Sequence, residues 1–206
     1  MTDKIFINER NEKVNYDRYE KREIDLIKKF IKEDDVVLEL GARYGGTSIA
    51  INQILKDKKK QVSVDPDSRV WESLETNKKN HQCEFIIIKG TISNKPQKII
   101  KESRKFDDNN DWATYTEECR EGHGTECEGV AVNYALPLLN FNVLVADCEG
   151  FLETFYDENK NMFPYLRLII FEKDRPDFCN YDRLINEFKM LGFKCIQNDF
   201  HSVFMK

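Results

Sequence analysis

The chain has 206 residues, of which 40% are hydrophobic and 33% are charged, and its formal net charge is −5. This length suits one domain with its own hydrophobic core. An acidic chain without a basic block is a poor nucleic-acid binder, because that affinity depends on neutralising phosphates. No apolar run approaches the length of a membrane-spanning helix, and the scattered cysteines are typical of reduced thiols. We therefore expect a cytoplasmic protein with no nucleic-acid partner and no membrane span.

The first predicted helix covers residues 16–33. Its apolar face comprises Ile24, Ile27, Phe30 and Ile31. Such a helix would either cover the edge of a sheet or form the roof of a ligand site. We favour simple packing, and we regard residues 1–33 as an N-terminal helical cover.

The stretch from residue 36 to residue 48 combines a buried strand, a glycine turn and a helix N-terminus. Residues 36–40 are almost entirely apolar, glycines follow at positions 41, 45 and 46, and Thr47 and Ser48 open an apolar-periodic run. In an open α/β sheet this order marks a nucleotide-like ligand site, because glycine lets the chain turn sharply and lets a ligand approach the backbone. The spacing matches neither the dinucleotide fingerprint nor a phosphate loop.

Glu39, two positions before the first glycine, bears on the identity of that ligand. A carboxylate about 4 Å from a pyrophosphate would be repelled by roughly 4 kcal/mol at an effective dielectric constant near 20. S-adenosylmethionine has no phosphate and carries an ammonium and a sulfonium, so an acid here favours that cofactor over a dinucleotide. For Glu39 alone, a strand-end side chain that faces solvent explains the sequence equally well.

The second predicted strand covers residues 61–65 and ends on Asp65, which stands 24 positions after Gly41. An acid roughly 20 residues beyond the glycine turn binds ribose hydroxyls in such folds, and a carboxylate accepts charge-assisted hydrogen bonds from both hydroxyls. Asp-Pro is also a common turn sequence. The offset favours the ribose role for Asp65.

A helix over residues 69–80 precedes a third strand over residues 84–88, which we expect to be buried on both faces because it contains three consecutive isoleucines. The turn that follows falls where an adenine base lies in such a fold. Thr91 and Ile92 are therefore candidates for contacts to the base.

Residues 94–133 interrupt the alternation of strands and helices, so we predict an inserted hairpin-like arm. Its expected strands cover residues 98–103, 112–116 and 129–133. The spacing Cys119-x-x-x-His123-x-x-x-Cys127 raises the question of zinc. It is not the paired spacing of structural zinc sites and a fourth ligand is missing, so we do not favour a zinc site.

The last third of the sequence predicts two more buried strands and a terminal pair. Residues 141–146 lead into Asp147-Cys148-Glu149-Gly150, and residues 166–171 lead into Glu172. A helix is expected after each strand, and residues 193–197 and 200–205 close the chain as an antiparallel pair. The predicted fold class is therefore α/β, with a mostly parallel sheet, helices on both faces and a C-terminal antiparallel strand pair.

Acidic residues occupy the carboxyl ends of four predicted strands. They are Glu39, Asp65, Asp147 and Glu172. Ligands of open α/β sheets bind beyond these ends, so we expect the four acids to surround one crevice. Strand-end acids also cap helices, which is the structural alternative.

Several segments resemble the FkbM-type S-adenosylmethionine-dependent methyltransferases. They are Glu39-x-Gly41-Ala42-x-x-Gly45, Asp65-Pro66, and Ala146-Asp147-Cys148-Glu149-Gly150-Phe151 with Phe171-Glu172 downstream. The glycine turn is generic, and the Asp-x-Glu-Gly segment is the specific feature. The sequence departs from that family's pattern at Arg43, Asp65 and Val145, where Asn, Glu and Lys are more usual.

The resemblance implies a Rossmann-like class I methyltransferase fold, with residues 1–206 as a single methyltransferase domain. It also implies O-methylation of a hydroxyl, most often on a sugar, with a small-molecule or glycan acceptor as partner. Such a domain would also suit a larger glycan-processing protein. The residues expected to bind the cofactor are Glu39, Gly41, Ala42, Arg43, Tyr44, Gly45, Thr47, Ser48, Asp65, Thr91 and Ile92.

Methyl transfer is an in-line displacement, and an alcohol acceptor needs a group that takes its proton. Asp147 is our first candidate for that base, with Glu149 or Glu172 positioning the acceptor or the cofactor's amino group. Asp147 and Glu172 could instead share a divalent cation that acidifies the hydroxyl, and the sequence does not decide between the two. The alternatives are a non-catalytic S-adenosylmethionine-binding module and an NAD-type Rossmann oxidoreductase or epimerase.

Overall fold

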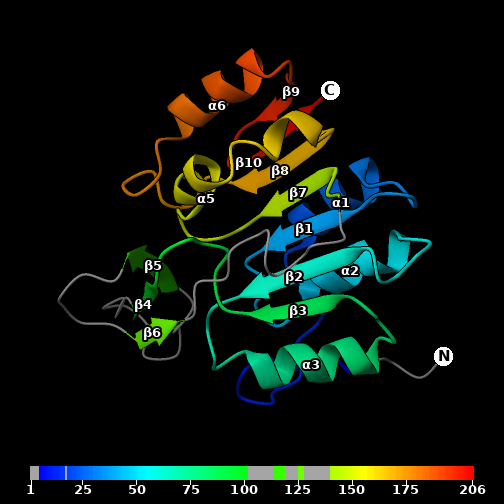
Figure 1. Cartoon of the computed structure of the whole chain (residues 1–206). Coiled ribbons are helices and arrows are strands. Elements are labelled where there is room, and N and C mark those ends of the chain that lie inside the picture. The colour runs from blue at the N-terminus through cyan, green and yellow to red at the C-terminus, as the bar shows by residue number, and fades with distance from the viewer. Residues whose placement is uncertain (1–4, 17, 102–113, 119–124, 128–139) are drawn as a thin grey trace.

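The centre of the molecule is a seven-stranded sheet with the strand order β3-β2-β1-β7-β8-β10-β9 (Figure 1). The computed structural model describes residues 5–16, 18–101, 114–118, 125–127 and 140–206. Strands β3, β2, β1, β7 and β8 run parallel, and β10 is antiparallel to β8 and β9. The strands are β1 Val37–Leu40, β2 Gln61–Asp65, β3 Ile86–Lys89, β7 Val143–Ala146, β8 Leu168–Glu172, β9 Lys194–Asn198 and β10 His201–Met205. The predicted parallel sheet and terminal antiparallel pair are confirmed.

Helices cover both faces of this sheet because its central strands are apolar on both faces. Leu38 and Leu144 point to the face covered by α5 and α6, whereas Val37 and Val143 point to the face covered by α1 and α2. Figure 1 shows α5 and α6 in front of the strands and α1 and α2 behind them. The helices are α1 Lys21–Phe30, α2 Gly46–Ile54, α3 Trp71–Asn80, α5 Leu152–Glu158 and α6 Tyr181–Met190, with the short 3-10 helix η1 Phe163–Tyr165.

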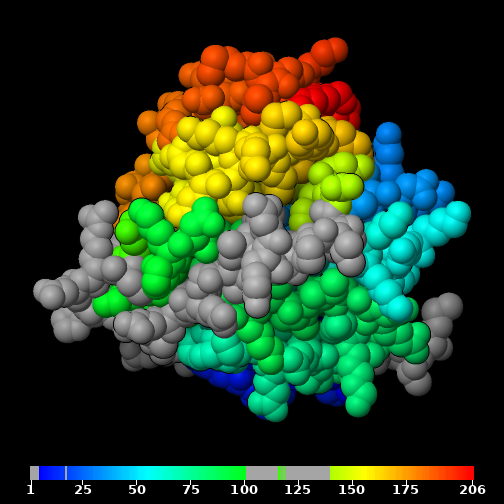
Figure 2. All heavy atoms as spheres, in the orientation of Figure 1, coloured from blue at the N-terminus to red at the C-terminus, as the bar shows by residue number. Residues whose placement is uncertain are grey.

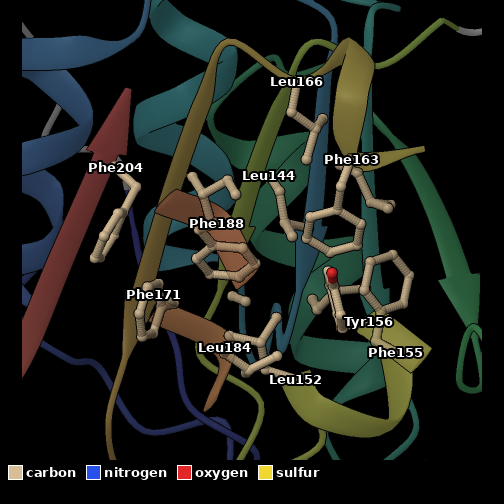
Figure 3. Packing of buried hydrophobic residues seen from close by; sticks show 14 of the residues in the cluster. Leu144, Leu152, Phe155, Tyr156, Phe163, Leu166, Phe171, Leu184, Phe188 and Phe204 are labelled. Atoms are coloured by element: carbon tan, nitrogen blue, oxygen red, sulfur yellow. The ribbon is translucent and has the colours of Figure 1, made fainter. Parts of the chain in front are cut away.

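Aromatic rings fill the layer between the sheet and α5 and α6 (Figure 3). Phe188 of α6 stacks on Phe163 at 5.6 Å between ring centroids, and it meets Phe171 and Phe204 of the sheet edge-on. These side chains are almost completely buried. Strand β10 is therefore held by a core shared with α6 as well as by its backbone hydrogen bonds.

The expectation that β3 would be buried on both faces is wrong, because all four of its residues are exposed or partly exposed. The strand also lies at the edge of the sheet. Among the strands that the structure describes, β2 is its one hydrogen-bonded neighbour, and Ile86 is 44% exposed. The apolar side chain that anchors this segment is Phe85, which packs on Ala42 and Leu74. A run of isoleucines predicts a strand, but it does not say how many neighbouring strands the strand will have.

Helix α1 is shorter than the predicted helix over residues 16–33. It begins at Lys21 because Glu20 has a left-handed backbone with φ of 45°, and it ends at Phe30 because Ile31 is extended. Ile24, Ile27 and Ile31 pack on the sheet as expected. The sheet-facing side also contains Glu23, which is 2% exposed.

The inserted arm forms a second, three-stranded sheet in the order β5-β4-β6. Its strands are β4 Gln97–Lys101, β5 Thr114–Glu118 and β6 Thr125–Cys127. It lies on the side toward which the parallel strands point (Figure 1). The expected strand over residues 129–133 and the positions Cys119 and His123 lie outside the described residues.

The beginning of the arm is attached to α5, and the two segments adjoin on the molecular surface (Figure 2). The Glu158 carboxylate accepts hydrogen bonds from the Ser93 hydroxyl at 3.2 Å and from the Asn94 backbone N–H at 2.8 Å. Among the described helices, none is both long enough and apolar enough to cross a bilayer.

Candidate functional site

A cavity of about 310 Å³ lies at the carboxyl ends of the parallel strands. Strand register explains its position, because Leu40 is aligned with Val64 on one side and with Ala146 on the other. The residues that follow these positions, Gly41, Asp65 and Asp147, therefore reach the same edge of the sheet, and all three line the cavity. This is the edge at which open α/β sheets bind ligands.

Gly41 forms the wall between β1 and β7. Its φ is +88°, and a Cβ added to it would lie 1.6 Å from the backbone oxygen of Asp147. The two strand ends are also joined by the Asp147 N–H, which donates to the Leu40 carbonyl at 3.0 Å. Position 41 thus requires glycine for two reasons: the backbone there is left-handed, and the Asp147 backbone comes too close for a Cβ.

Asp65 is held by the backbone around it. One carboxylate oxygen accepts from the Arg43 N–H at 2.7 Å, and the other accepts from the Asp67 N–H at 2.8 Å. Burial raises the pKa of Asp65 to about 6. Each carboxylate oxygen has a second lone pair, so the side chain keeps the capacity to accept two hydroxyl hydrogen bonds from a ligand in the cavity.

The turn after β3 contributes the next wall. Thr91 and Ile92 both line the cavity and are almost completely buried. The Gly90 N–H donates to the backbone oxygen of Asp65 at 3.1 Å, which fixes this turn against the end of β2. The predicted ribose and base residues therefore stand side by side in one cavity.

Glu39 does not line the cavity, contrary to the prediction. It is 1% exposed, and its oxygens accept from the hydroxyls of Thr47 and Ser48 at 2.5 Å and from the Ser63 hydroxyl. Burial raises the pKa of Glu39, and these hydrogen bonds oppose that shift. The side chain ties β1, β2 and the first turn of α2 together, so Glu39, Thr47 and Ser48 support the glycine turn from behind.

The other residues of the glycine turn also serve its packing. Ala42 packs on Leu74, and Tyr44 is fully buried against Phe6. Gly45 precedes α2 with φ of +90°. Of the residues predicted to bind a cofactor, those that line the cavity are Gly41, Arg43, Asp65, Thr91 and Ile92.

Of the three predicted catalytic acids, Asp147 and Glu149 line the cavity and Glu172 does not. Glu172 instead lies beside Asp147 and Glu23, with one carboxylate oxygen from each of the three within 4.8 Å of the others. Burial and then the negative charges of Glu23 and Glu172 raise the pKa of Asp147 well above its usual value. Glu172 also meets His201, with 3.0 Å between Oε2 and Nε2.

The segment leading into α1 also lines the cavity, through Tyr19 and Glu20. Helix α1 itself packs on the sheet, as preferred, and the described residues of the predicted 16–33 segment that reach the cavity are the two that precede it. Burial raises the pKa of Glu20 to about 7. One signal in the sequence points to α1, because Glu23 stands four residues before Ile27 and so shares its apolar stripe.

No protein-family model matches the chain, and no curated protein matches it in sequence. Solved structures do match. A precorrin-8w decarboxylase of Methanobacterium thermoautotrophicum is 12% identical over 98% of this chain and 96% of its own, with a TM-score of 0.55. A precorrin-6y C5,15-methyltransferase of Geobacter metallireducens is 10% identical over 90% and 89%, with a TM-score of 0.53.

A third similar structure is a Streptococcus pneumoniae protein solved in complex with S-adenosyl-L-methionine. It is 10% identical over 89% of this chain and 70% of its own, with a TM-score of 0.52. At these identities the likeness concerns the fold. The chain has the Rossmann-like fold of class I methyltransferases.

Proposed function

We propose that the protein is an S-adenosylmethionine-dependent O-methyltransferase that acts on a hydroxyl of a sugar or glycan. The observation that carries this proposal is the set of groups around the 310 Å³ cavity, which combines the glycine wall, Asp65, the Thr91–Ile92 turn and Asp147. Asp65 would accept from the ribose hydroxyls, and Thr91 and Ile92 would contact the adenine. The methionine part would then extend past Gly41 towards Asp147.

The charge of the cavity supports a cationic guest. Glu20, Asp65, Asp147 and Glu149 all line it. Arg43 also lines it, and its guanidinium lies over the Tyr44 ring at 5.1 Å. A pyrophosphate in this cavity would meet several carboxylates, whereas an ammonium and a sulfonium would be stabilised by them.

The acceptor would enter from the side of the molecule on which the inserted arm (β4, β5 and β6) lies. A second cavity, of about 360 Å³, shares Thr116, Glu149 and Phe151 with the first. Phe178 and Glu158 also line it. Aromatic faces beside carboxylates suit a sugar, which presents apolar ring faces and hydroxyl donors.

The reaction requires that the acceptor hydroxyl lose its proton as its oxygen attacks the methyl group. Asp147 stands at the cofactor cavity and is placed either to take that proton or to hold a cation that acidifies the hydroxyl. The resemblance of residues 146–151 to FkbM-type enzymes supports a hydroxyl acceptor, and the acidic composition disfavours a nucleic acid.

Calorimetry and a transfer assay test the proposal. S-adenosylmethionine should bind to the purified chain, and NAD should not. Asp147→Asn should lower the release of S-adenosylhomocysteine with a glycoside panel by about 100-fold or more while retaining cofactor affinity within about tenfold. Asp182→Asn, on the exposed side of α6, is the matched control.

Each unfavourable outcome has a distinct meaning. NAD binding without S-adenosylmethionine binding would refute the proposed cofactor and favour an oxidoreductase. Cofactor binding without transfer to any glycoside, peptide or nucleic acid would favour the non-catalytic module. Methyl transfer to a peptide or a nucleic acid, but to no glycoside, would support a methyltransferase and refute the proposed glycan acceptor.

A further inference from the structure

A group of three carboxylates, one buried and two partly exposed, lies next to the proposed cofactor cavity. It consists of Glu23, Asp147 and Glu172, and one oxygen from each lies within 4.8 Å of the other two. Asp147 alone of the three lines the cavity. The group therefore begins at the cavity wall and continues behind it, towards α1.

Sheet geometry explains why these residues meet. Ala146 is aligned with Phe171, so Asp147 and Glu172 are neighbours at the ends of β7 and β8. Alternation along each strand turns both side chains to the face covered by α1, the face to which Val145 and Ile170 also point. Helix α1 packs on that face and brings Glu23 to the same point.

Glu23 is a buried acid with an unused oxygen. The side chain is 2% exposed, and none of the residues that the structure describes donates a hydrogen bond to its Oε2. Burial and then the negative charges of Glu20, Glu172, Glu39 and Asp174 raise the pKa of Glu23 well above its usual value. A buried carboxylate oxygen without a donor is costly, so this atom calls for a cationic or donor partner.

The described residues supply little positive charge at this point. No lysine or arginine among them forms an ion pair with any of the three acids, and His201 meets one oxygen of Glu172 at 3.0 Å. The donor set is thus three carboxylates from three different elements. Hard divalent cations such as Mg²⁺ and Mn²⁺ prefer oxygen ligands of this kind.

We propose that Glu23, Asp147 and Glu172 bind one divalent cation, Mg²⁺ or Mn²⁺, at the inner end of the cofactor cavity. The binding itself does not depend on the proposed function, but its role in catalysis rests on it. The acceptor hydroxyl would become a further ligand of the cation, which lowers the pKa of that hydroxyl.

The transfer step moves one proton and one methyl group. The acceptor O–H bond breaks and its proton passes to the Glu149 carboxylate, which lines both cavities. The acceptor oxygen forms a bond to the methyl carbon as the carbon–sulfur bond breaks. The electron pair of that bond stays on sulfur, which leaves neutral S-adenosylhomocysteine.

Metal binding is tested on the whole chain, stripped with EDTA and free of S-adenosylmethionine. Bound Mn²⁺ is measured from the decrease in the electron paramagnetic resonance signal of free Mn²⁺. We expect one Mn²⁺ to bind per chain, and we expect Mg²⁺ to compete for the same site. Glu23→Gln and Glu172→Gln should each weaken Mn²⁺ binding by about tenfold or more. Asp25→Asn, an exposed acid on the same helix, is the matched control and should not change it.

No saturable Mn²⁺ binding by the unmutated chain up to about 10 mM would overturn the proposal, because even weak protein sites bind below that concentration. So would unchanged Mn²⁺ affinity in both glutamine variants. Loss of cofactor affinity in Glu23→Gln without any metal binding would assign the acids to the cofactor's ammonium instead. Because cofactor binding is measured separately in EDTA, failure of this proposal is distinguishable from failure of the proposed function.

Discussion

Replacing Gly41 with alanine tests the geometry on which the whole site depends. The new Cβ would lie 1.6 Å from the Asp147 oxygen and 2.7 Å from the Asp147 carbonyl carbon, and both of these are backbone atoms. A left-handed backbone costs a non-glycine residue about 1–3 kcal/mol, and overpacking costs about 1–3 kcal/mol more. The expected destabilisation is therefore about 2–6 kcal/mol, which in a chain of this size lowers Tm by about 4–24 °C.

Gly192→Ala is the matched control, because Gly192 has the same φ of +88° and nothing within 4 Å of the added Cβ. Gly192→Ala should lower the free energy of unfolding only by the cost of the left-handed backbone, which is about 1–3 kcal/mol. Thermal unfolding by circular dichroism gives both values, and calorimetry should show that only Gly41→Ala loses S-adenosylmethionine binding. Equal losses of stability in the two variants, with cofactor binding intact in both, would refute the close approach of β1 to Asp147.

Two further predictions concern the acids of the site. Burial raises the pKa of Asp65 to about 6, so this group adds stability below its unfolded pKa near 3.8 that is lost as the pH rises through 6. The ionised form accepts the ribose hydroxyls, so S-adenosylmethionine affinity by calorimetry should fall from about pH 7.5 to about pH 5, and Asp65→Asn should flatten that dependence. Glu39→Gln should bind the cofactor within about threefold of the unmutated chain, since Glu39 touches hydroxyls and not the cavity. A loss of cofactor affinity of about 30-fold at unchanged Tm would indicate that Glu39 contacts the cofactor directly, as predicted from the sequence.

The sequence predicted the sheet well because its signals are local. An apolar run, a glycine turn and an apolar-periodic run at residues 36–54 specify a strand, a turn and a helix without knowledge of the rest of the chain. The same applies to the terminal pair, observed as Lys194–Asn198 and His201–Met205. Asp65 was also placed correctly in the cavity, because its offset from Gly41 reflects the fixed length of one strand–helix–strand unit.

The direction of a side chain could not be predicted in the same way. Glu39 was expected to face a ligand because it stands close to the glycine turn in sequence. Its position one residue before the end of β1 instead turns it towards α2, where Thr47 and Ser48 supply donors. The edge position of β3 and the left-handed Glu20 that starts α1 depend on tertiary packing, which a single sequence does not reveal.

The number of acids at the site, and the side of the sheet on which they lie, indicate the charge of the ligand that the site would bind. Glu39 near the end of β1, Asp147 just after β7 and Glu172 at the end of β8 lie on the same side of three neighbouring strands. Of these three acids, Glu39 accepts hydrogen bonds from the hydroxyls of nearby residues. Burial and other carboxylates raise the pKa of Asp147, and one Glu23 oxygen has no hydrogen-bond donor in the described part of the chain. Burial and neighbouring negative charges raise the pKa of Glu20, Glu23 and Asp147, and an adjacent positive charge would stabilise their ionised forms. A sulfonium cofactor in the cavity and a divalent cation held by Glu23, Asp147 and Glu172 at its inner end would together supply that charge.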